Sequence, residues 1–400
     1  MSKFIDNLWV KEIIYNSNSY KQIDIVNKYT RCSDFLDKMK GASPFVILKA
    51  RNNLATLVTF LAIRKIGQVC VFVDPQVGNI ELNEYCSLLQ PWCIIDHKEE
   101  NGVDLIESEI SIVSYEKHVQ IDYEIHEDVC AIMFSSAEDG YMKPVMITED
   151  NIFSDIFQGL LWGEINDSSR TTCGIIPFYH IYGLVNGLLM PLINGGRILI
   201  VEITDLSKLI KIVDEIKLYG VTNIYSIPLI FYLISRIKDI KILLSDVKSI
   251  YSGGYKLTER VFNDFFQKTQ KQIHEGYGLT ESTGLSVGHW VTKPANPAYI
   301  GLITPVNQLR IIDSEGRDVV MGETGEIWLK GANISKGFYN NLDENNKYFE
   351  NGWLKTGDLA HLDDQGHVYF DGLLKRMYNI AGKNVYPAEV ERLFKINDNV

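Results

Sequence analysis

The chain has 400 residues, of which 46% are apolar and 22% charged, a composition typical of a globular protein with more than one packed unit. Its 39 basic and 51 acidic residues give a net charge of −12, which argues against a nucleic acid or an anionic membrane surface as partner. No run of about 18 apolar residues is present, so we expect no membrane span. The first residues lack the apolar core of a signal peptide, and the six scattered cysteines form no Cys-x-x-Cys pair. We therefore expect a cytoplasmic protein with reduced thiols and no zinc site.

Short β-branched runs alternate with amphipathic stretches through the first two hundred residues. We expect a helix over residues 54–63 and strands at 45–49, 69–73, 92–95, 130–134 and 197–201. Continuous apolar strands that alternate with helices predict parallel sheets covered on both faces.

The pattern changes between about residues 291 and 370. Shorter strands there are bounded by turn sequences such as 313–316 and 363–366. This pattern predicts a small antiparallel or barrel-like subdomain. Further on, residues 388–394 have the pattern of a helix.

Four motifs follow one another in the second half of the chain. They are His274-Glu275-Gly276-Tyr277-Gly278-Leu279-Thr280-Glu281-Ser282, Gly325-Glu326, Thr356-Gly357-Asp358, and residues 382–391. A single Tyr-Gly-Leu-Thr-Glu could be an ordinary turn. In this order and at these distances, however, the motifs resemble those of the adenylate-forming enzymes, which comprise acyl-CoA ligases, luciferases and peptide-synthetase adenylation domains. These enzymes join a carboxylate to AMP and then pass the acyl group on, usually to a thiol.

The resemblance covers nearly the whole chain and implies an α/β fold. We expect residues 1–374 to form a large AMP- and acyl-binding N-terminal domain, with two stacked α/β subdomains and a β-rich subdomain at about 291–370. Residues 375–400 would be the hinge and the start of a small α+β C-terminal domain. The family's catalytic lysine would lie beyond residue 400, and the sequence leaves open whether the chain is a piece of a longer protein or naturally short.

The resemblance also assigns roles to the Tyr-Gly-Leu-Thr-Glu motif. The Tyr277 ring would lie against adenine, and Gly276 and Gly278 would let the backbone approach the nucleotide. The Thr280 hydroxyl would donate to the α-phosphate, and the Glu281 carboxylate would hold Mg²⁺. The alternative is a glycine turn before a capped helix.

Asp358 resembles the carboxylate that accepts both ribose hydroxyls, for which its two oxygens suit a vicinal diol. The alternative is an aspartate in a turn. The family has an arginine that reaches the ribose where this chain has Leu373, which has no hydrogen-bond donor, and the sequence does not tell whether Arg376 compensates. Lys375 falls on the family's hinge and is assigned to the cofactor site.

The acyl pocket is predicted from two segments. His180, within residues 177–184, would be an aromatic gate or a neighbour of the substrate carboxylate, or else a packing residue. Residues 251–255, which include Gly253, Gly254 and Tyr255, resemble the strand and loop that line the family's acyl pocket, with the glycines leaving room for the acyl chain. Relatives that activate amino acids usually carry an aspartate close to this motif, which holds the substrate's amino group. No acidic residue lies between residues 174 and 196, so the resemblance implies an aryl or fatty acid without an α-amine.

The phosphate-binding loop departs from the family pattern. Four of its positions are retained, namely Ser135, Ser136, Gly140 and Lys143. Ala137 replaces a glycine, and Glu138 and Asp139 replace hydroxyl residues. A carboxylate about 4 Å from a phosphate charge costs about 4 kcal/mol at an effective dielectric constant of about 20, so ATP use is open to question.

Two functions follow from these residues. The first is a carboxylic-acid ligase that uses ATP and Mg²⁺ to form an acyl-AMP, and then forms a thioester with CoA or a phosphopantetheinyl carrier protein as acyl acceptor. The second is a degenerate relative that binds an acyl-adenylate or a protein partner without catalysis, which the altered phosphate loop and Leu373 motivate.

Replacing both loop acids tests whether they face the phosphates. We expect the Glu138→Thr, Asp139→Thr double variant to bind ATP more tightly than the unmodified protein, most clearly at low salt, where repulsion is least screened. Calorimetry at two ionic strengths measures the difference. Equal ATP affinities would show that both carboxylates point away from the nucleotide.

Overall fold

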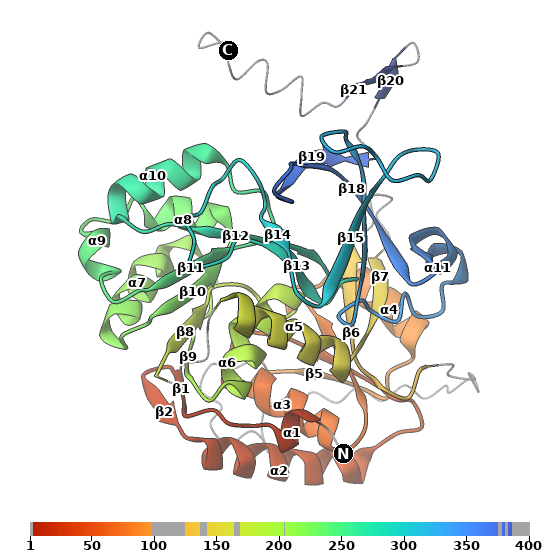
Figure 1. Ribbon diagram of the computed structural model, residues 1–400. Coiled ribbons are helices and arrows are strands. Elements are labelled where there is room, and N and C mark those ends of the chain that lie inside the picture. Colours follow the sequence, from red (N-terminus) through yellow and green to blue (C-terminus); the bar gives the residue numbers. More distant parts are fainter. Residues whose placement is uncertain are drawn as a thin grey trace.

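The computed structural model describes residues 3–97, 125–136, 142–163, 169–203, 205–374, 378–380 and 383–385 (Figure 1). Two large sheets stack against each other in an α/β fold. The larger sheet has the strand order β14-β13-β12-β11-β10-β8-β9-β1-β2. Its strands are β1 (Glu12–Tyr15), β2 (Asn18–Tyr20), β8 (Thr171–Gly174), β9 (Arg197–Ile200), β10 (Asn223–Ser226), β11 (Ser249–Ser252), β12 (His274–Leu279), β13 (Gly284–Gly288) and β14 (Leu302–Ile303).

The second sheet has the order β5-β3-β4-β6-β7. It contains β3 (Phe45–Lys49), β4 (Val69–Val73), β5 (Cys93–Asp96), β6 (Val129–Ser136) and β7 (Met142–Thr148). The predicted α/β fold and the predicted strands are confirmed. The expectation of purely parallel sheets is wrong at the edges: β2, β7, β13 and β14 run antiparallel to their neighbours because hairpins, rather than helical crossovers, join β1 to β2, β6 to β7 and β12 to β13.

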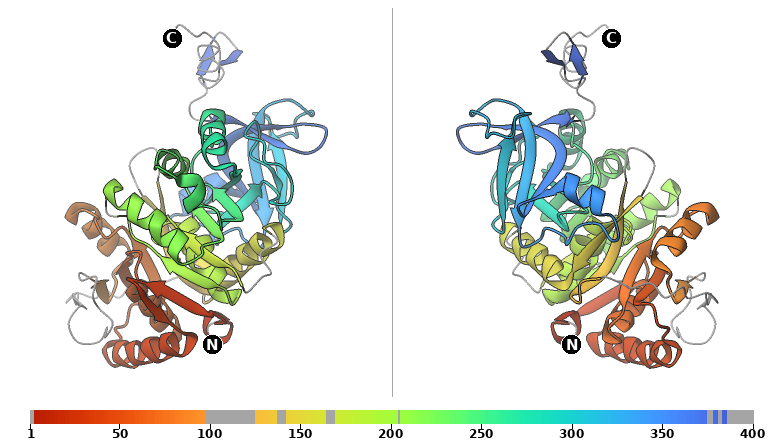
Figure 2. Two further views of the ribbon diagram at one scale, coloured as in Figure 1. Left: turned by 90° about the vertical axis from the view of Figure 1, so that its left-hand side faces the viewer. Right: turned by 90° about the vertical axis from the view of Figure 1, so that its right-hand side faces the viewer.

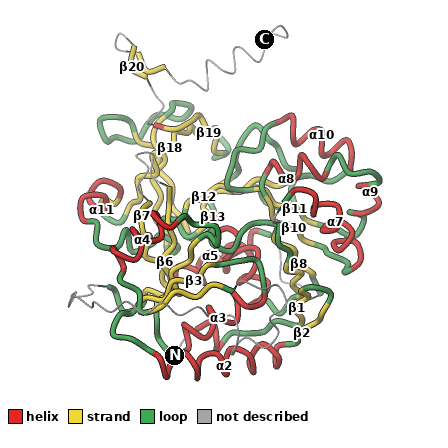
Figure 3. Tube along the Cα trace, turned by 180° about the vertical axis from the view of Figure 1, so that it is seen from behind, coloured by secondary structure: helices red, strands yellow, loops and turns green. Residues whose placement is uncertain are grey.

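The helices cover both faces of each sheet. They are α1 (Lys3–Asp6), α2 (Gln22–Met39), α3 (Leu54–Lys65), α4 (Asn79–Leu89), α5 (Glu149–Trp162), η1 (Gly183–Leu189), α6 (Met190–Ile193), η2 (Leu206–Lys208), α7 (Leu209–Leu218), α8 (Pro228–Ile234), α9 (Ile240–Leu243) and α10 (Glu259–Thr269). The predicted helix over 54–63 is confirmed as α3, which begins where the Asn53 side chain accepts a hydrogen bond from the Thr56 N–H at 2.8 Å. Seen from behind, α2 and α3 run beneath the strands (Figure 3).

Alternate residues along the strands enter different cores. Val46 and Leu48 of β3 face the core between the sheets, where α3, α5, η1 and α6 pack. Phe45 and Ile47 face the opposite core, under α4. A third core lies under α7–α10, on the outer side of the larger sheet. The continuous apolar strands therefore follow from burial on both faces.

An antiparallel sheet follows in the chain and stands beside the ends of the two larger sheets (Figure 2). It comprises β15 (Asn307–Ile312), β16 (Gly325–Gly331), β17 (Phe349–Glu350), β18 (Trp353–Leu362) and β19 (Val368–Leu373), with helix α11 (Leu342–Tyr348) inserted between β16 and β17. Its own core includes Ile311, Ile327 and Leu329. The predicted turns at 313–316 and 363–366 end β15 and β18, and each is held by an aspartate that accepts backbone N–H groups.

The hairpin of β20 (Tyr378–Ile380) and β21 (Lys383–Val385) ends the described part of the chain. The helix predicted at 388–394 lies outside it, and the division at residue 374 stays a prediction. None of the helices in the described ranges combines the length and apolar character that a bilayer crossing needs. All six cysteines are buried and free.

Candidate active site

A cleft of about 670 Å³ opens where the carboxyl ends of the central strands meet the antiparallel sheet. The cleft brings together most of the residues predicted for the site: Ser135, Lys143, His180, Gly253, Gly254, Tyr255, Gly276, Tyr277, Gly278, Thr280, Glu281 and Asp358. The Ser136 side chain, Gly140 and Lys375 lie outside the described residues, as do Glu138 and Asp139. The roles of these residues stay predictions, but most of the predicted residues line the same cavity.

Topology explains this convergence. Strands β8, β10, β11 and β12 are neighbours and run parallel, so their carboxyl ends lie along one edge. In sheets of this kind, ligands bind outside that edge. Residues that are far apart in the chain therefore reach the same cavity.

The Tyr277 and Asp358 side chains meet at one end of the cleft. The Tyr277 hydroxyl donates a hydrogen bond of 2.6 Å to Asp358 Oδ2, which joins β12 to β18. Burial raises the pKa of Tyr277 well above its usual range, with the Asp358 carboxylate as a second cause, so the phenol stays protonated. The predicted adenine and ribose contacts are thus direct neighbours.

A turn in β18 explains why two of the sequence motifs occur together. Gly357 has φ +73°, a conformation that favours glycine, and its N–H donates to the Glu326 Oε1 at 2.9 Å. The Thr356 hydroxyl donates to the Ile327 carbonyl and accepts from the Asp358 N–H. The Gly-Glu motif therefore shapes the turn that presents the Asp358 carboxylate.

Leu373 lies directly across from Asp358 in the pairing of β18 with β19, and both line the cleft. Side chains at paired positions stand on the same face of a sheet. An arginine at position 373 would therefore reach the carboxylate's ligand, whereas leucine offers only apolar surface. The departure noted in the sequence thus lies inside the cleft.

The β12–β13 hairpin presents Thr280 and Glu281. A Cβ on Gly278 would lie 1.5 Å from the Gly284 carbonyl oxygen, so only glycine fits there. The Ser282 hydroxyl closes the turn, with contacts of 3.0 Å to the Leu279 N–H and the Gly284 carbonyl. The sequence is followed by a strand, β13, and not by the capped helix of the alternative reading.

Glu281 is half-buried and lines the cleft beside Thr280 and Ser135. Burial raises its pKa, while Ser135 and Lys143 oppose that shift. A half-buried carboxylate with a raised pKa, next to hydroxyl groups, is suited to bind a hard cation that prefers oxygen ligands. Among the described residues, no group of three or more His, Cys, Asp or Glu side chains could hold a metal ion.

The inner wall of the cleft is aromatic, and the sequence analysis assigned no role to one of its tyrosines, Tyr225. Tyr225 and Tyr251 stack with their ring centroids 4.6 Å apart and an interplanar angle of 9°. Tyr182 donates its hydroxyl hydrogen bond to the Tyr251 carbonyl at 3.1 Å. Tyr255 lies at the mouth with 74% of its surface exposed, and the exposed His180 stands beside the Tyr179 ring. The available signal was positional, because Tyr225 and Tyr251 each come just before the end of a parallel strand.

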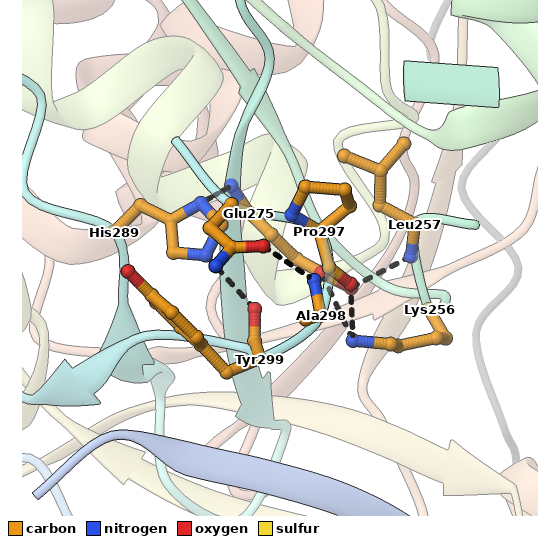
Figure 4. Close-up of polar contacts among 8 residues, drawn as sticks. Lys256, Leu257, Glu275, His289, Pro297, Ala298 and Tyr299 are labelled. Carbon is orange, nitrogen blue, oxygen red and sulfur yellow. Dashed lines mark hydrogen bonds and ion pairs between the residues drawn. The ribbon is translucent and has the colours of Figure 1, made fainter. Parts of the chain in front are cut away.

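Glu275 is a buried carboxylate at the edge of the cleft, with 3% of its surface exposed (Figure 4). It accepts the Leu257 N–H at 2.6 Å and forms an ion pair of 3.4 Å with Lys256. The His289 Nδ1 accepts the Glu275 N–H, so Nε2 carries the proton and donates to the Tyr299 carbonyl. Sequence analysis missed this network, which ties the loop after β11 to β12.

Two opposite pKa shifts follow from this burial. Burial raises the pKa of Glu275 to about 7, although Lys256 opposes the shift. Burial also lowers the pKa of His289 to about 4, so its ring is neutral. The carboxylate is therefore the group in this network that changes charge near neutral pH.

Comparison with known proteins gives one matching family model, that of the AMP-binding enzymes, over residues 15–339. The long-chain-fatty-acid–CoA ligase of Haemophilus influenzae is 29% identical over 297 residues, which cover 73% of this chain and 52% of that protein. A probable 4-coumarate–CoA ligase 1 of Dictyostelium discoideum is 31% identical over 275 residues, 67% of this chain and 49% of that protein. The chain thus spans about half the length of the curated relatives it matches.

Solved structures share the fold at lower identity. ATP-bound MatB from Rhodopseudomonas palustris superposes with a TM-score of 0.83 and 20% identity, over 97% of this chain and 80% of that one. The anthranilate CoA ligase AuaEII in complex with anthranoyl-AMP gives 0.83 and 18%, over 99% and 82%. The O-succinylbenzoate CoA synthetase of Bacillus subtilis in complex with AMP gives 0.82 and 19%, over 100% and 84%.

The Glu275→Gln variant tests the buried carboxylate. The folded-state pKa of about 7 lies above the unfolded value of about 4.3, so the folded chain binds the extra proton between these values. Stability from this group is present at about pH 4 and is lost as the pH rises to about 7. We therefore expect the melting temperature of Glu275→Gln minus that of the unmodified chain to increase between pH 5 and 7.5.

Thermal melts across this range measure the difference, with Glu84→Gln, a change at an exposed position of α4, as the control. The control curve should run parallel to that of the unmodified chain. Parallel curves for Glu275→Gln as well would show that Glu275 is ionised throughout and that Lys256 compensates its burial.

Proposed function

Because the chain belongs to the family of AMP-binding enzymes, we propose that it activates a carboxylic acid with ATP and transfers the acyl group to a thiol. The first step forms a bond between a carboxylate oxygen and the α-phosphorus and breaks the bond to pyrophosphate, which leaves. In the second step a thiol sulfur takes the acyl group and AMP leaves. The acceptor would be CoA or a phosphopantetheinyl carrier protein.

One observation carries this proposal. The Tyr277–Asp358 hydrogen bond and the Thr280–Glu281 turn share a single cleft with Ser135 and Lys143. An aromatic ring, a carboxylate for a diol, a hydroxyl and an ammonium group in one cavity match the parts of a nucleoside triphosphate. The cleft also has room beyond them, along the tyrosine wall.

The chemistry of such a site is positional and electrostatic. Thr280 would donate to an α-phosphate oxygen, and Lys143 faces the end where pyrophosphate would leave. Glu281 is the residue that would hold Mg²⁺, which supplies charge neutralisation on the phosphates when bound. Asp358 would fix the ribose and so the distance between the α-phosphate and the acyl pocket.

We infer that the substrate is a carboxylic acid without an α-amine, and that an aryl acid is preferred to a fatty acid. The stacked Tyr225 and Tyr251 rings form a flat wall that suits an aromatic ring. Glu275 could in principle bind a substrate amine, but it already pairs with Lys256 and accepts the Leu257 N–H. The named activities of the relatives, which cover fatty and coumaric acids, leave both classes for the test.

A second candidate is a relative that binds an adenylate without forming it. Leu373, which lies opposite Asp358, favours it because a ribose contact of the family is missing. Glu138 and Asp139 favour it at the level of sequence. Under this candidate AMP would still bind, whereas ATP would not be consumed.

Nucleotide binding tests the assignment of Asp358. We expect AMP to raise the melting temperature of the unmodified protein, because a ligand that binds only the folded state stabilises it. Asp358→Ala should lose most of that shift, since it removes the acceptor for the ribose. Differential scanning fluorimetry with increasing AMP gives both values.

The matched control is Asp364→Ala, which removes an exposed carboxylate from the turn after β18. It should keep the full AMP-induced shift. If Asp358→Ala also keeps it, the ribose lies elsewhere, and the assignment of this end of the cleft is wrong.

A further inference from the structure

Helix α11 places a carboxylate on the lysine at the phosphate end of the cleft. Glu344 forms an ion pair with the Lys143 ammonium group, and 9% of Lys143 is exposed. Lys143 pairs with Ser135 across β6 and β7, and both line the cleft. The carboxylate therefore acts on a group that belongs to the predicted phosphate site.

Aromatic rings complete the surroundings of this ammonium group. Lys143 Nζ lies 4.0 Å from the centroid of the Tyr348 ring and 5.4 Å from that of Phe338. Burial lowers the pKa of Lys143, but Glu344 and Tyr348 outweigh it, and the pKa lies above its ordinary value. Burial raises the pKa of Glu344, yet Lys143 brings it below its ordinary value, so both partners are charged at neutral pH.

Residues other than Glu344 anchor helix α11 through side chain–backbone hydrogen bonds. The Asn345 side chain accepts the Phe338 N–H at 2.7 Å and donates to the Phe338 carbonyl at 2.8 Å. Asn341 caps the helix by accepting the Glu344 N–H at 3.1 Å. With the helix held by these side chain–backbone contacts, the Glu344 carboxylate is free to serve another role.

We propose that Glu344 is a specificity-determining residue that competes with the β- and γ-phosphates of ATP for Lys143. This inference rests on the proposed function, because it assumes that a nucleoside triphosphate enters the cleft. To bind these phosphates, Lys143 must exchange the Glu344 carboxylate for phosphate oxygens. The displaced carboxylate then remains close to the phosphates and repels them.

The competition acts on only one part of the nucleotide. AMP has no β- or γ-phosphate, and the contacts predicted for it, Tyr277, Thr280 and Asp358, are residues of the cleft other than Lys143. Glu344 therefore lowers the affinity for ATP relative to AMP and adenylates, and it returns to Lys143 when pyrophosphate leaves. Lys347, 3.5 Å from the other Glu344 oxygen, is exposed and reduces the repulsion only in part.

Calorimetric titrations with ATP and with AMP test this inference in the full chain. Glu344→Gln keeps the side chain's size and removes its charge. We expect it to bind ATP about threefold to tenfold more tightly, the range of a partly screened charge pair, with AMP affinity unchanged. Asp343→Asn, the neighbouring acid on the same helix, is the matched control and should change neither affinity.

The Lys143→Met variant completes a double-mutant cycle with Glu344→Gln. In this background the Glu344→Gln change should give no gain for ATP, because the contested ammonium group is absent. Glu344→Asp, which shortens the side chain by one methylene, should give a smaller gain than Gln and replaces it if the Gln variant does not fold. A purely structural role of Glu344 would move the melting temperature but not the ratio of ATP to AMP affinity.

The outcomes separate this inference from the proposed function. AMP binding with unchanged ATP affinity in Glu344→Gln overturns the inference and leaves the proposed function standing. Equal tightening of ATP and AMP also overturns it, since the effect would then be general electrostatics. Failure of the unmodified protein to bind either nucleotide contradicts the proposed function itself.

Discussion

The hydrogen bond from Tyr277 to Asp358 is the contact on which the cleft depends. It spans 81 residues of sequence and links the larger sheet to the antiparallel sheet, so it fixes how the two walls face each other. Its geometry is prepared on both sides by glycines: Gly278 lets β12 pass close to β13, and Gly357 turns β18 toward the cleft. The two side chains predicted to contact a nucleotide base and ribose thus hold each other in position, and such preorganisation lowers the entropy cost of binding a ligand.

The charged residues that line the cleft include both carboxylates and ammonium groups, and several of them are already paired. Among the described residues that line it, Glu275, Glu281 and Asp358 are carboxylates, and Lys143 and Lys355 are ammonium groups. Glu275 has its own partner in Lys256, and Lys355 pairs with Glu350 at 2.5 Å. Lys143 is paired as well, with Glu344. Under the proposed function, a polyphosphate that enters this cleft would need a cation or would have to displace an existing ion pair.

Sequence reasoning predicted the fold and most of a set of residues that the structure brings together in one cleft, but it did not predict all of the cleft's interior. The helix at 54–63 and the strands near 45–49 and 69–73 could be predicted, because burial on both faces leaves continuous apolar runs. Tyr225 could not be assigned to the cleft, since an aromatic residue in a strand has the pattern of ordinary core, whereas Tyr251 belongs to the segment 251–255 that resembles the family's pocket lining. The opposition of Leu373 to Asp358 requires the register of β18 with β19, and the pairing of Glu344 with Lys143 joins segments two hundred residues apart. A short motif can be recognised in the sequence because its residues are neighbours in the chain. Contacts between distant segments form only when the chain folds, so the sequence does not show them.

Acid-dependent exchange of pyrophosphate into ATP tests the central claim most directly. The assay detects the reversal of adenylation and needs no thiol acceptor. With the complete natural protein and a panel of aryl, short-chain and long-chain acids, our account predicts exchange with at least one acid that lacks an α-amine, strongest among aryl acids, and none with amino acids. Absence of exchange with every acid, in protein that binds AMP, would contradict a ligase and leave a protein that binds adenylates without making them.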